Sequence, residues 1–239
     1  MLFRSRTLNR FNYNHRNENV WLYDMANIYL PKSLPLNELP DEREQLCLGG
    51  YGDNIDFFVM KGVIEEIFGR LGMTERYELK ADCGRPYLHP GRRADIRYGG
   101  KLVGYMGEVH PAVAGRYDFK QDARVYIAVL DMPVVTEFAS FERRYEGVAR
   151  YPAVTRDISM LVPRAVMAGD IEHILLQRGG KLLEDFRLFD IYEGLQVRAG
   201  FKSMAYSLSF RSKDHTLTDD EVGSAMNKIL NGLGGLGCE

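Results

Sequence analysis

The chain has 239 residues, of which 45% are hydrophobic and 27% are charged, a composition typical of a globular protein with one or two domains. The formal net charge is −2, so no overall basic character points to a nucleic acid, and any contact with RNA must be local. The sequence contains neither an apolar run of 18 residues nor a signal peptide, and we therefore expect a cytoplasmic protein without membrane contact.

The number and spacing of the cysteines indicate the redox compartment. Cys47, Cys83 and Cys238 are odd in number and form no Cys-x-x-Cys pair. This argues against a disulfide framework and against a zinc ribbon, and it favours a reducing compartment.

The first half of the chain alternates strand signals with one strong helix signal. Apolar residues recur at helical spacing from Asp56 to Leu71, and Gly72 stands where a glycine often ends a helix. Pro111 is placed to open a short helix. Predicted strands cover Val20–Leu30, Gln45–Tyr51, Arg93–Tyr98, Lys101–Val109 and Arg124–Leu130, the third and fourth joined at Gly99-Gly100. The pattern predicts an antiparallel sheet with few helices, class α+β.

A domain boundary is predicted between residues 141 and 150, where a charged run precedes Tyr151-Pro152. Proline biases the residue before it towards an extended conformation, as expected at the entrance to a new domain. We therefore expect domains over residues 1–145 and 146–239.

The second half predicts a β-α-β-β-α-β order, which is the ferredoxin-like arrangement. Strands are expected over Asp157–Val162, Leu182–Tyr192 and Lys202–Phe210, with helices over Asp170–Arg178 and Thr218–Leu230. Thr218 and Glu221 have the spacing of a capping box. Only a stub of a final strand fits into residues 236–239.

Alternation along the strands separates a buried face from an open one. The large apolar residues on the buried face are Ile158, Met160, Val162, Met204, Tyr206, Leu208 and Phe210. The open face carries Asp157, Ser159, Ser203, Ala205, Ser207 and Ser209. Because these positions are small and polar, they differ from the exposed aromatic residues on which RNA recognition motifs stack bases.

The second strand breaks this alternation, because Phe189 follows Leu188 directly. Strict alternation would bury the Asp190 carboxylate at a high cost in free energy. One interpretation is a bulge near residues 188–189 that turns Phe189 and Ile191 inward and Asp190 and Tyr192 outward. The other is that Asp190 caps the end of the strand.

Several ordered blocks resemble a known family. Tyr-Pro-Ala-Val-x-Arg-Asp (151–157), Leu-Phe-Asp-x-Tyr (188–192), Gly-x-Lys-Ser (200–203) and Thr-Leu-Thr-Asp-x-Glu-Val (216–222) resemble the ferredoxin-fold anticodon-binding domain of bacterial phenylalanyl-tRNA synthetase β subunits. Asn-His-Arg-Asn (14–17), Phe58 with Lys61-Gly62, His-Pro-Gly-Arg (89–92) and Gly-Tyr-Met-Gly-Glu-Val-His-Pro (104–111) resemble the non-catalytic, class II synthetase-like domain of the same subunits.

The resemblance implies a tRNA-binding and subunit-assembly part of an (αβ)₂ ligase that joins phenylalanine to tRNA(Phe). Chemistry would lie on the α subunit, so no catalytic residue and no metal ligand is expected in this chain. ATP and Mg²⁺ would serve the complete enzyme, with no cofactor bound here. Asp190 and Ser203 match the positions that contact the first anticodon base, and Tyr192 matches the nearby tyrosine.

The resemblance also implies that much of the β subunit is absent. The oligonucleotide-binding-like domain, the editing domain and the domain with the Mg²⁺-ligating carboxylates find no counterpart here. Residues 1–9 match the family poorly, and we expect the class II-like domain to lack its first elements.

Several charged residues allow two interpretations. Lys202 and Arg156, together with Arg211, could contact phosphates or could lie on a solvated strand edge. Arg92, Arg93 and Arg97 could clamp a phosphate, or could serve a solvated strand or a subunit contact.

His89, Glu108 and His110 could form a metal or general-base site, or could hold turns at strand ends; the spacing of a His-Glu-x-x-His metal site is missing. Three hypotheses follow: a tRNA-binding and assembly portion of a ligase, an autonomous enzyme using residues 108–110, and a purely structural interaction module.

Overall fold

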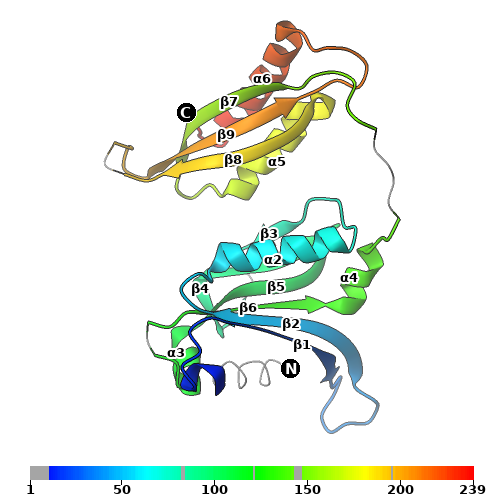
Figure 1. The fold of residues 1–239 in the computed structure, drawn as a ribbon, viewed down its shortest axis with the longest axis vertical. Coiled ribbons are helices and arrows are strands. Elements are labelled where there is room, and N and C mark those ends of the chain that lie inside the picture. Colours follow the sequence, from blue (N-terminus) through cyan, green and yellow to red (C-terminus); the bar gives the residue numbers. More distant parts are fainter. Residues whose placement is uncertain (1–10, 82–83, 121, 143–146, 195) are drawn as a thin grey trace. The chain divides into compact units, whose positions relative to one another are not determined.

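The computed structural model describes residues 11–81, 84–120, 122–142, 147–194 and 196–239 (Figure 1). The chain divides into two compact units, Met1–Arg144 and Tyr145–Glu239, and each is described by itself. The expected boundary at residues 145 and 146 falls within residues 143–146, outside the described residues, and stays a prediction.

The first unit is built on a six-stranded antiparallel sheet in the order β1-β2-β6-β5-β4-β3. All predicted strands are confirmed, although β2 and β4 begin earlier than expected. The short strand β3 was missed because three residues carry no readable alternation. The strands are β1 (Val20–Leu30), β2 (Asp41–Tyr51), β3 (Glu78–Lys80), β4 (Leu88–Tyr98), β5 (Lys101–Val109) and β6 (Val125–Asp131).

The predicted helix of the first unit is α2 (Phe57–Arg70). The Asp56 carboxylate caps it by accepting from the backbone N–H of Val59 at 2.7 Å. Gly72 follows with a φ of 70°, the left-handed conformation that ends many helices. The short helices α3 (Pro111–Ala114) and α4 (Met132–Phe138) and the 3₁₀ turn η1 (Gly115–Tyr117) complete the unit; α4 and η1 were not predicted.

The central strands of this sheet are buried on both faces. Along β6, Tyr126, Ala128 and Leu130 belong to the cluster that contains the buried residues of α2. The alternate residues Ile127 and Val129 belong to a second cluster on the opposite face. A strand that is covered on both sides reads as a continuous apolar run, as this one does.

The second unit has the first five elements predicted for a ferredoxin-like domain, β-α-β-β-α, with a three-stranded antiparallel sheet in the order β7-β9-β8. Figure 1 shows α5 and α6 on one side of this sheet. The α+β class, with two antiparallel sheets, is therefore confirmed. The elements are β7 (Val154–Pro163), α5 (Ala168–Gly179), η2 (Gly180–Leu182), β8 (Leu183–Tyr192), β9 (Phe201–Phe210) and α6 (Asp219–Gly234).

The expected final strand is reduced to a single pair of residues. Glu239 exchanges both backbone hydrogen bonds with Leu161 of β7, at 2.9 and 2.7 Å. Among the described residues no further pairing of residues 236–239 with β7 is present, and no fourth strand is assigned. The capping box of α6 is confirmed, because Thr218 and Glu221 bond each other's backbone N–H groups.

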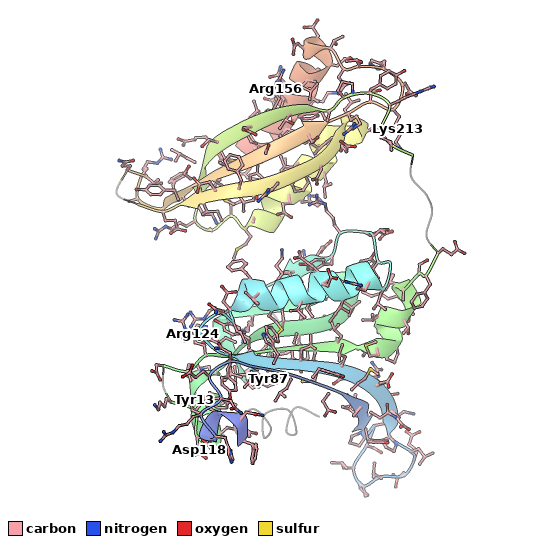
Figure 2. All side chains as sticks on the ribbon, in the orientation of Figure 1. Tyr13, Tyr87, Asp118, Arg124, Arg156 and Lys213 are labelled. Carbon is pink, nitrogen blue, oxygen red and sulfur yellow. The ribbon has the colours of Figure 1, made fainter. Side chains whose placement is uncertain are left out.

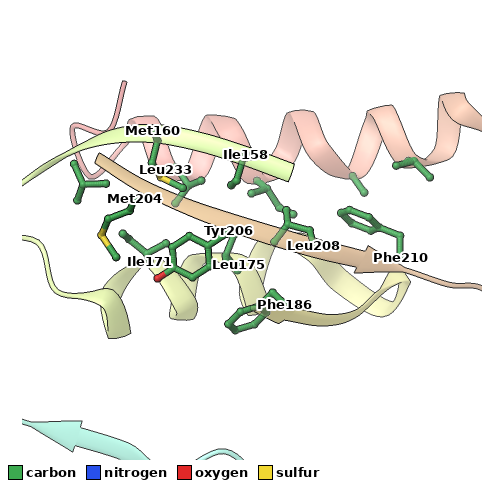
Figure 3. Packing of buried hydrophobic residues seen from close by; sticks show 14 of the residues in the cluster. Ile158, Met160, Ile171, Leu175, Phe186, Met204, Tyr206, Leu208, Phe210 and Leu233 are labelled. Atoms are coloured by element: carbon green, nitrogen blue, oxygen red, sulfur yellow. The ribbon is translucent and has the colours of Figure 1, made fainter. Parts of the chain in front are cut away.

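The helices cover the face of the sheet that the alternation predicted. All seven apolar residues assigned to this face are buried, together with Ile171 and Leu175 of α5 and Val222 and Ile229 of α6. Figure 3 shows these side chains packed between strands and helices. The other face carries Asp157 and the serines of β9, as expected.

Strand β8 contains the predicted bulge, but Phe189 was placed on the wrong side. Leu188 pairs with Tyr206 and Asp190 with Ala205, so Phe189 is the extra residue. Phe189 was expected to turn inward; instead its ring is 53% exposed and borders a groove together with Ser207 and Ser209 of the open face. The two residues of such a bulge share one neighbour on the partner strand, which leaves both on the open side.

Beyond the bulge, Ile191 pairs with Met204 and shares the register of the core face. It therefore turns inward as expected, although its side chain remains half exposed. Strand β8 continues to Tyr192, and the alternative that Asp190 caps the strand end is therefore also wrong.

Candidate nucleic-acid interface

Three of the five predicted site residues lie together on the open face of the second unit. Asp190 pairs with Ala205, and Tyr192 pairs with Ser203 on the same face. Neighbouring pairs on one face lie roughly 6.8 Å apart along a strand. Asp190, Tyr192 and Ser203 therefore present a carboxylate, a phenol ring and a hydroxyl to the same patch of solvent.

The ring of Tyr192 is placed by the loop that follows it. A side chain on Gly194 would put its first carbon 2.2 Å from the Tyr192 hydroxyl oxygen. Only glycine leaves that space free. Tyr192 is 45% exposed, so part of its ring is available to a partner.

Lys202 and Arg156 lie on the other side of the sheet. Lys202 pairs with Val162, and Arg156 pairs with Leu208, both in the register of the core face. The Lys202 ammonium donates to the Val166 carbonyl oxygen at 2.9 Å. Arg156 is labelled in Figure 2. Its guanidinium forms an ion pair with Asp219 at 2.8 Å. The structure does not bring these two cations to the other three residues.

Arg211, the third cation considered for phosphate contacts, is also engaged. It donates to the Tyr151 carbonyl oxygen at 2.7 Å and to Glu184 at 2.9 Å. Its position links the start of β7 to β8, and it acts there as a structural cation.

The open face also holds a groove that the sequence analysis did not identify. Its volume is about 420 Å³. Alternation along β8 could have assigned Asp185 and Arg187 to this face. The groove was not expected because Phe189, which borders it, was predicted to turn inward. The lining residues are Thr155, Asp157, Asp185, Phe186, Arg187, Phe189, Ser207 and Ser209.

The first unit offers little support for the enzyme hypothesis. His89 Nδ1 accepts from the Gly91 N–H at 3.1 Å, and His110 Nδ1 accepts from the Ala112 N–H at 3.2 Å. Both imidazoles therefore hold turns, as the structural interpretation expected. Within the described ranges no group of three or more potential metal ligands is found.

Glu108 is buried and engaged by its neighbours. It is 3% exposed, forms a short ion pair with Arg92, and accepts from the Tyr126 hydroxyl at 3.2 Å. Burial, and then the Glu108 carboxylate, raise the pKa of Tyr126. Arg92 lies on β4 with a partly exposed side chain, which agrees with the solvated-strand interpretation, and it pairs with this carboxylate.

Comparisons with known proteins agree with these two units. Residues 7–132 match the family model for the phenylalanyl tRNA synthetase beta chain CLM domain, and residues 149–235 match that for the ferredoxin-fold anticodon binding domain. No helix among the described residues is long and apolar enough to span a bilayer.

Curated relatives extend this result over most of the chain. The phenylalanine–tRNA ligase beta subunits of Clostridium acetobutylicum and Clostridium tetani are 37% and 38% identical over 222 residues, 93% of this chain. That of Symbiobacterium thermophilum is 36% identical over 242 residues, 96% of this chain. The chain spans only 26–27% of the length of these relatives. Taken with the matched models, these similarities show that the chain belongs to the phenylalanyl-tRNA synthetase β-chain family.

Proposed function

We propose that the second unit binds the anticodon of tRNA(Phe) through the open face of its sheet. The observation that carries this proposal is the shared placement of Asp190, Ser203 and Tyr192 on a solvent-facing sheet surface in a domain of the anticodon-binding family.

The chemistry of these groups suits the edge of an unpaired base. A carboxylate accepts from ring or amino N–H groups, and a serine hydroxyl can donate or accept. An exposed tyrosine ring can stack on a base. Asp190 and Ser203 would read the edge of the first anticodon base, while Tyr192 would support its ring.

The chain would serve as the RNA-binding and assembly portion of a cytoplasmic phenylalanine–tRNA ligase. We propose an (αβ)₂ enzyme in which the α subunit uses ATP and Mg²⁺ to join phenylalanine to tRNA, while this chain contributes no catalytic group. Aminoacylation by this chain alone, freed of any α subunit, would contradict the assignment. Phosphate contacts by Lys202 or Arg156 remain a prediction and would require these side chains to exchange their present partners.

The proposal is tested by fluorescence anisotropy with the whole chain and a labelled anticodon stem-loop of tRNA(Phe). Asp190→Asn should weaken binding by about 5- to 150-fold, since one bidentate base contact discriminates by about 1–3 kcal/mol. Ser203→Ala should weaken it less, because it removes a single hydroxyl. Asp220→Asn, at the exposed start of α6, removes the same charge away from the open face and serves as the control.

The result must depend on the anticodon as well as on the protein. Stem-loops with other anticodons should bind the wild-type chain and the Asp190→Asn variant equally weakly. Equal binding to all anticodons, or equal losses in Asp190→Asn and Asp220→Asn, would rule out recognition by this face.

A further inference from the structure

The open face of the second unit extends beyond the residues assigned to the anticodon. One step along the strands from Asp190 lies the groove of about 420 Å³, within the range of about 300–1,000 Å³ found for ligand sites. Figure 1 shows the helices on the opposite side of the sheet, so α5 and α6 do not cover this face. We call it the Arg187 groove, after the one cation among its eight lining residues.

Hydrogen-bonding groups cross the floor of the Arg187 groove in a row. Asp157 on β7 and Arg187 on β8 both pair with Ser207 on the central strand β9. Their backbones are therefore separated by two strand spacings, roughly 10 Å. Neither side chain bonds to another residue in the part of the chain that the structure describes. The row thus offers the Asp157 carboxylate as an acceptor, the Ser207 hydroxyl, and the N–H donors of the Arg187 guanidinium.

An aromatic ring borders the same groove. The bulge in β8 brings Phe189 to the open side, where its ring is 53% exposed. Water solvates such a ring poorly, so a flat partner on it is favoured. An exposed ring beside free hydrogen-bonding groups is the arrangement with which proteins bind single-stranded bases.

The charges on this face favour base edges over phosphates. Asp157, Asp185 and Asp190 share it with the single guanidinium of Arg187. The excess of carboxylates repels a phosphate backbone and attracts N–H donors. A purine fits the row because it carries N–H donors together with N7 or O6, the acceptors that arginine contacts.

We infer that the Arg187 groove is a second base-binding subsite, which takes a purine next to the base bound at Asp190 in the same RNA strand. The purine ring stacks on Phe189, and its edge lies between Asp157 and Arg187. The rows of Ser207 and Ala205 are about 6.8 Å apart, a step that consecutive unstacked bases can span. This inference rests on the proposed function and extends it from one base to two.

The test uses the whole chain and anticodon stem-loops in which each base flanking the one at Asp190 is a purine, a pyrimidine or an abasic residue. Phe189→Ala should weaken binding of the purine stem-loop by about 5- to 150-fold, the range for loss of one stacked base. Phe189→Leu keeps the apolar volume without the ring and should lose nearly as much. Arg187→Ala should weaken binding as well, whereas Lys228→Ala, an exposed cation on α6, should not.

Combining a protein variant with an RNA substitution distinguishes loss of this subsite from a general loss of protein stability. Replacing the flanking purine by an abasic residue should weaken binding to the wild-type chain but cause no further loss in Phe189→Ala. If Asp190→Asn loses binding while all groove variants bind like the wild type, the second subsite is overturned and the anticodon assignment stands. If Asp190→Asn also binds like the wild type, both fail.

Discussion

The two sheets of the molecule differ in what covers them. The six-stranded sheet of the first unit has an apolar cluster on each face, and its strand β6 is buried at six of seven positions. The three-stranded sheet of the second unit has one apolar cluster and leaves serines, carboxylates and two aromatic rings on the other face. A sheet face that is buried under other elements is not accessible to a partner. A sheet with one exposed, polar face can bind a partner without any unfolding.

The largest effect that tests this difference between buried and open faces is expected on strand β9, where neighbouring residues point to opposite faces. Leu208→Ala removes a fully buried side chain and should lower the free energy of unfolding of the second unit by about 3 kcal/mol. Ser209→Ala, on the open face, should change it by less than about 0.5 kcal/mol. Hydrogen exchange of the β9 amides measures both, and similar losses at the two positions would mean that the open face is packed after all.

A smaller effect is expected in the first unit at Arg92. Arg92→Ala leaves the buried Glu108 carboxylate without its cation, a change that costs about 3–5 kcal/mol for fully buried pairs. Because the Arg92 side chain is 39% exposed, we expect about 2 kcal/mol. Trp21, the sole tryptophan, lies in this unit and reports its unfolding by fluorescence.

Arg97→Ala is the matched control for Arg92→Ala. Arg97 lies on the same strand and, among the described residues, donates only to the Gly100 carbonyl oxygen at 3.3 Å. Its loss should cost less than about 0.5 kcal/mol. Equal destabilisation by the two variants would show that the Glu108 pair does not stabilise the doubly covered sheet.

The smallest effect concerns the capping box that begins α6. Hydrogen bonds from the Thr218 backbone, the His215 side chain and the Thr218 hydroxyl lower the pKa of Glu221 from 4.5 to about 2. Since the folded-state pKa is the lower one, the stabilisation is present above about pH 4.5 and is lost as the pH falls towards 2.

Glu221→Gln should therefore make the stability of the second unit less dependent on pH between 4.5 and 2. Thermal unfolding followed by circular dichroism at several pH values measures this slope. Asp220→Asn, in the same first turn of α6 but outside the capping box, is the control for removal of a carboxylate. An unchanged slope in Glu221→Gln would contradict the lowered pKa.

Much of the open face was predictable because strand alternation is local. Ser203 and Ser207 had to oppose Met204 and Leu208, whichever way the strand paired. The bulge was also foreseen, since strict alternation would have buried Asp190. The sequence could not show that Phe189 faces outward together with Asp190, because that depends on the pairing with Ala205 on another strand.

The cations were the least predictable part of the site. Lys202 stands beside Ser203 in the sequence, yet neighbours on a strand point to opposite faces, and Lys202 reaches the Val166 carbonyl oxygen. Arg156 finds Asp219, which is 63 residues away in the chain. Contacts between distant segments such as these carry no local signal.

By itself, the sequence determined the order of the longer helices and strands, most of the buried strand faces, the capping box and the motifs of the family. These depend on periodicities and spacings of a few residues, which the folded chain preserves. The tertiary structure decided that Phe189 faces outward, that Lys202 and Arg156 face away from Asp190, and that Asp157 and Arg187 lie on either side of Ser207. Each of these depends on the register between strands, which is set by packing over the whole sheet.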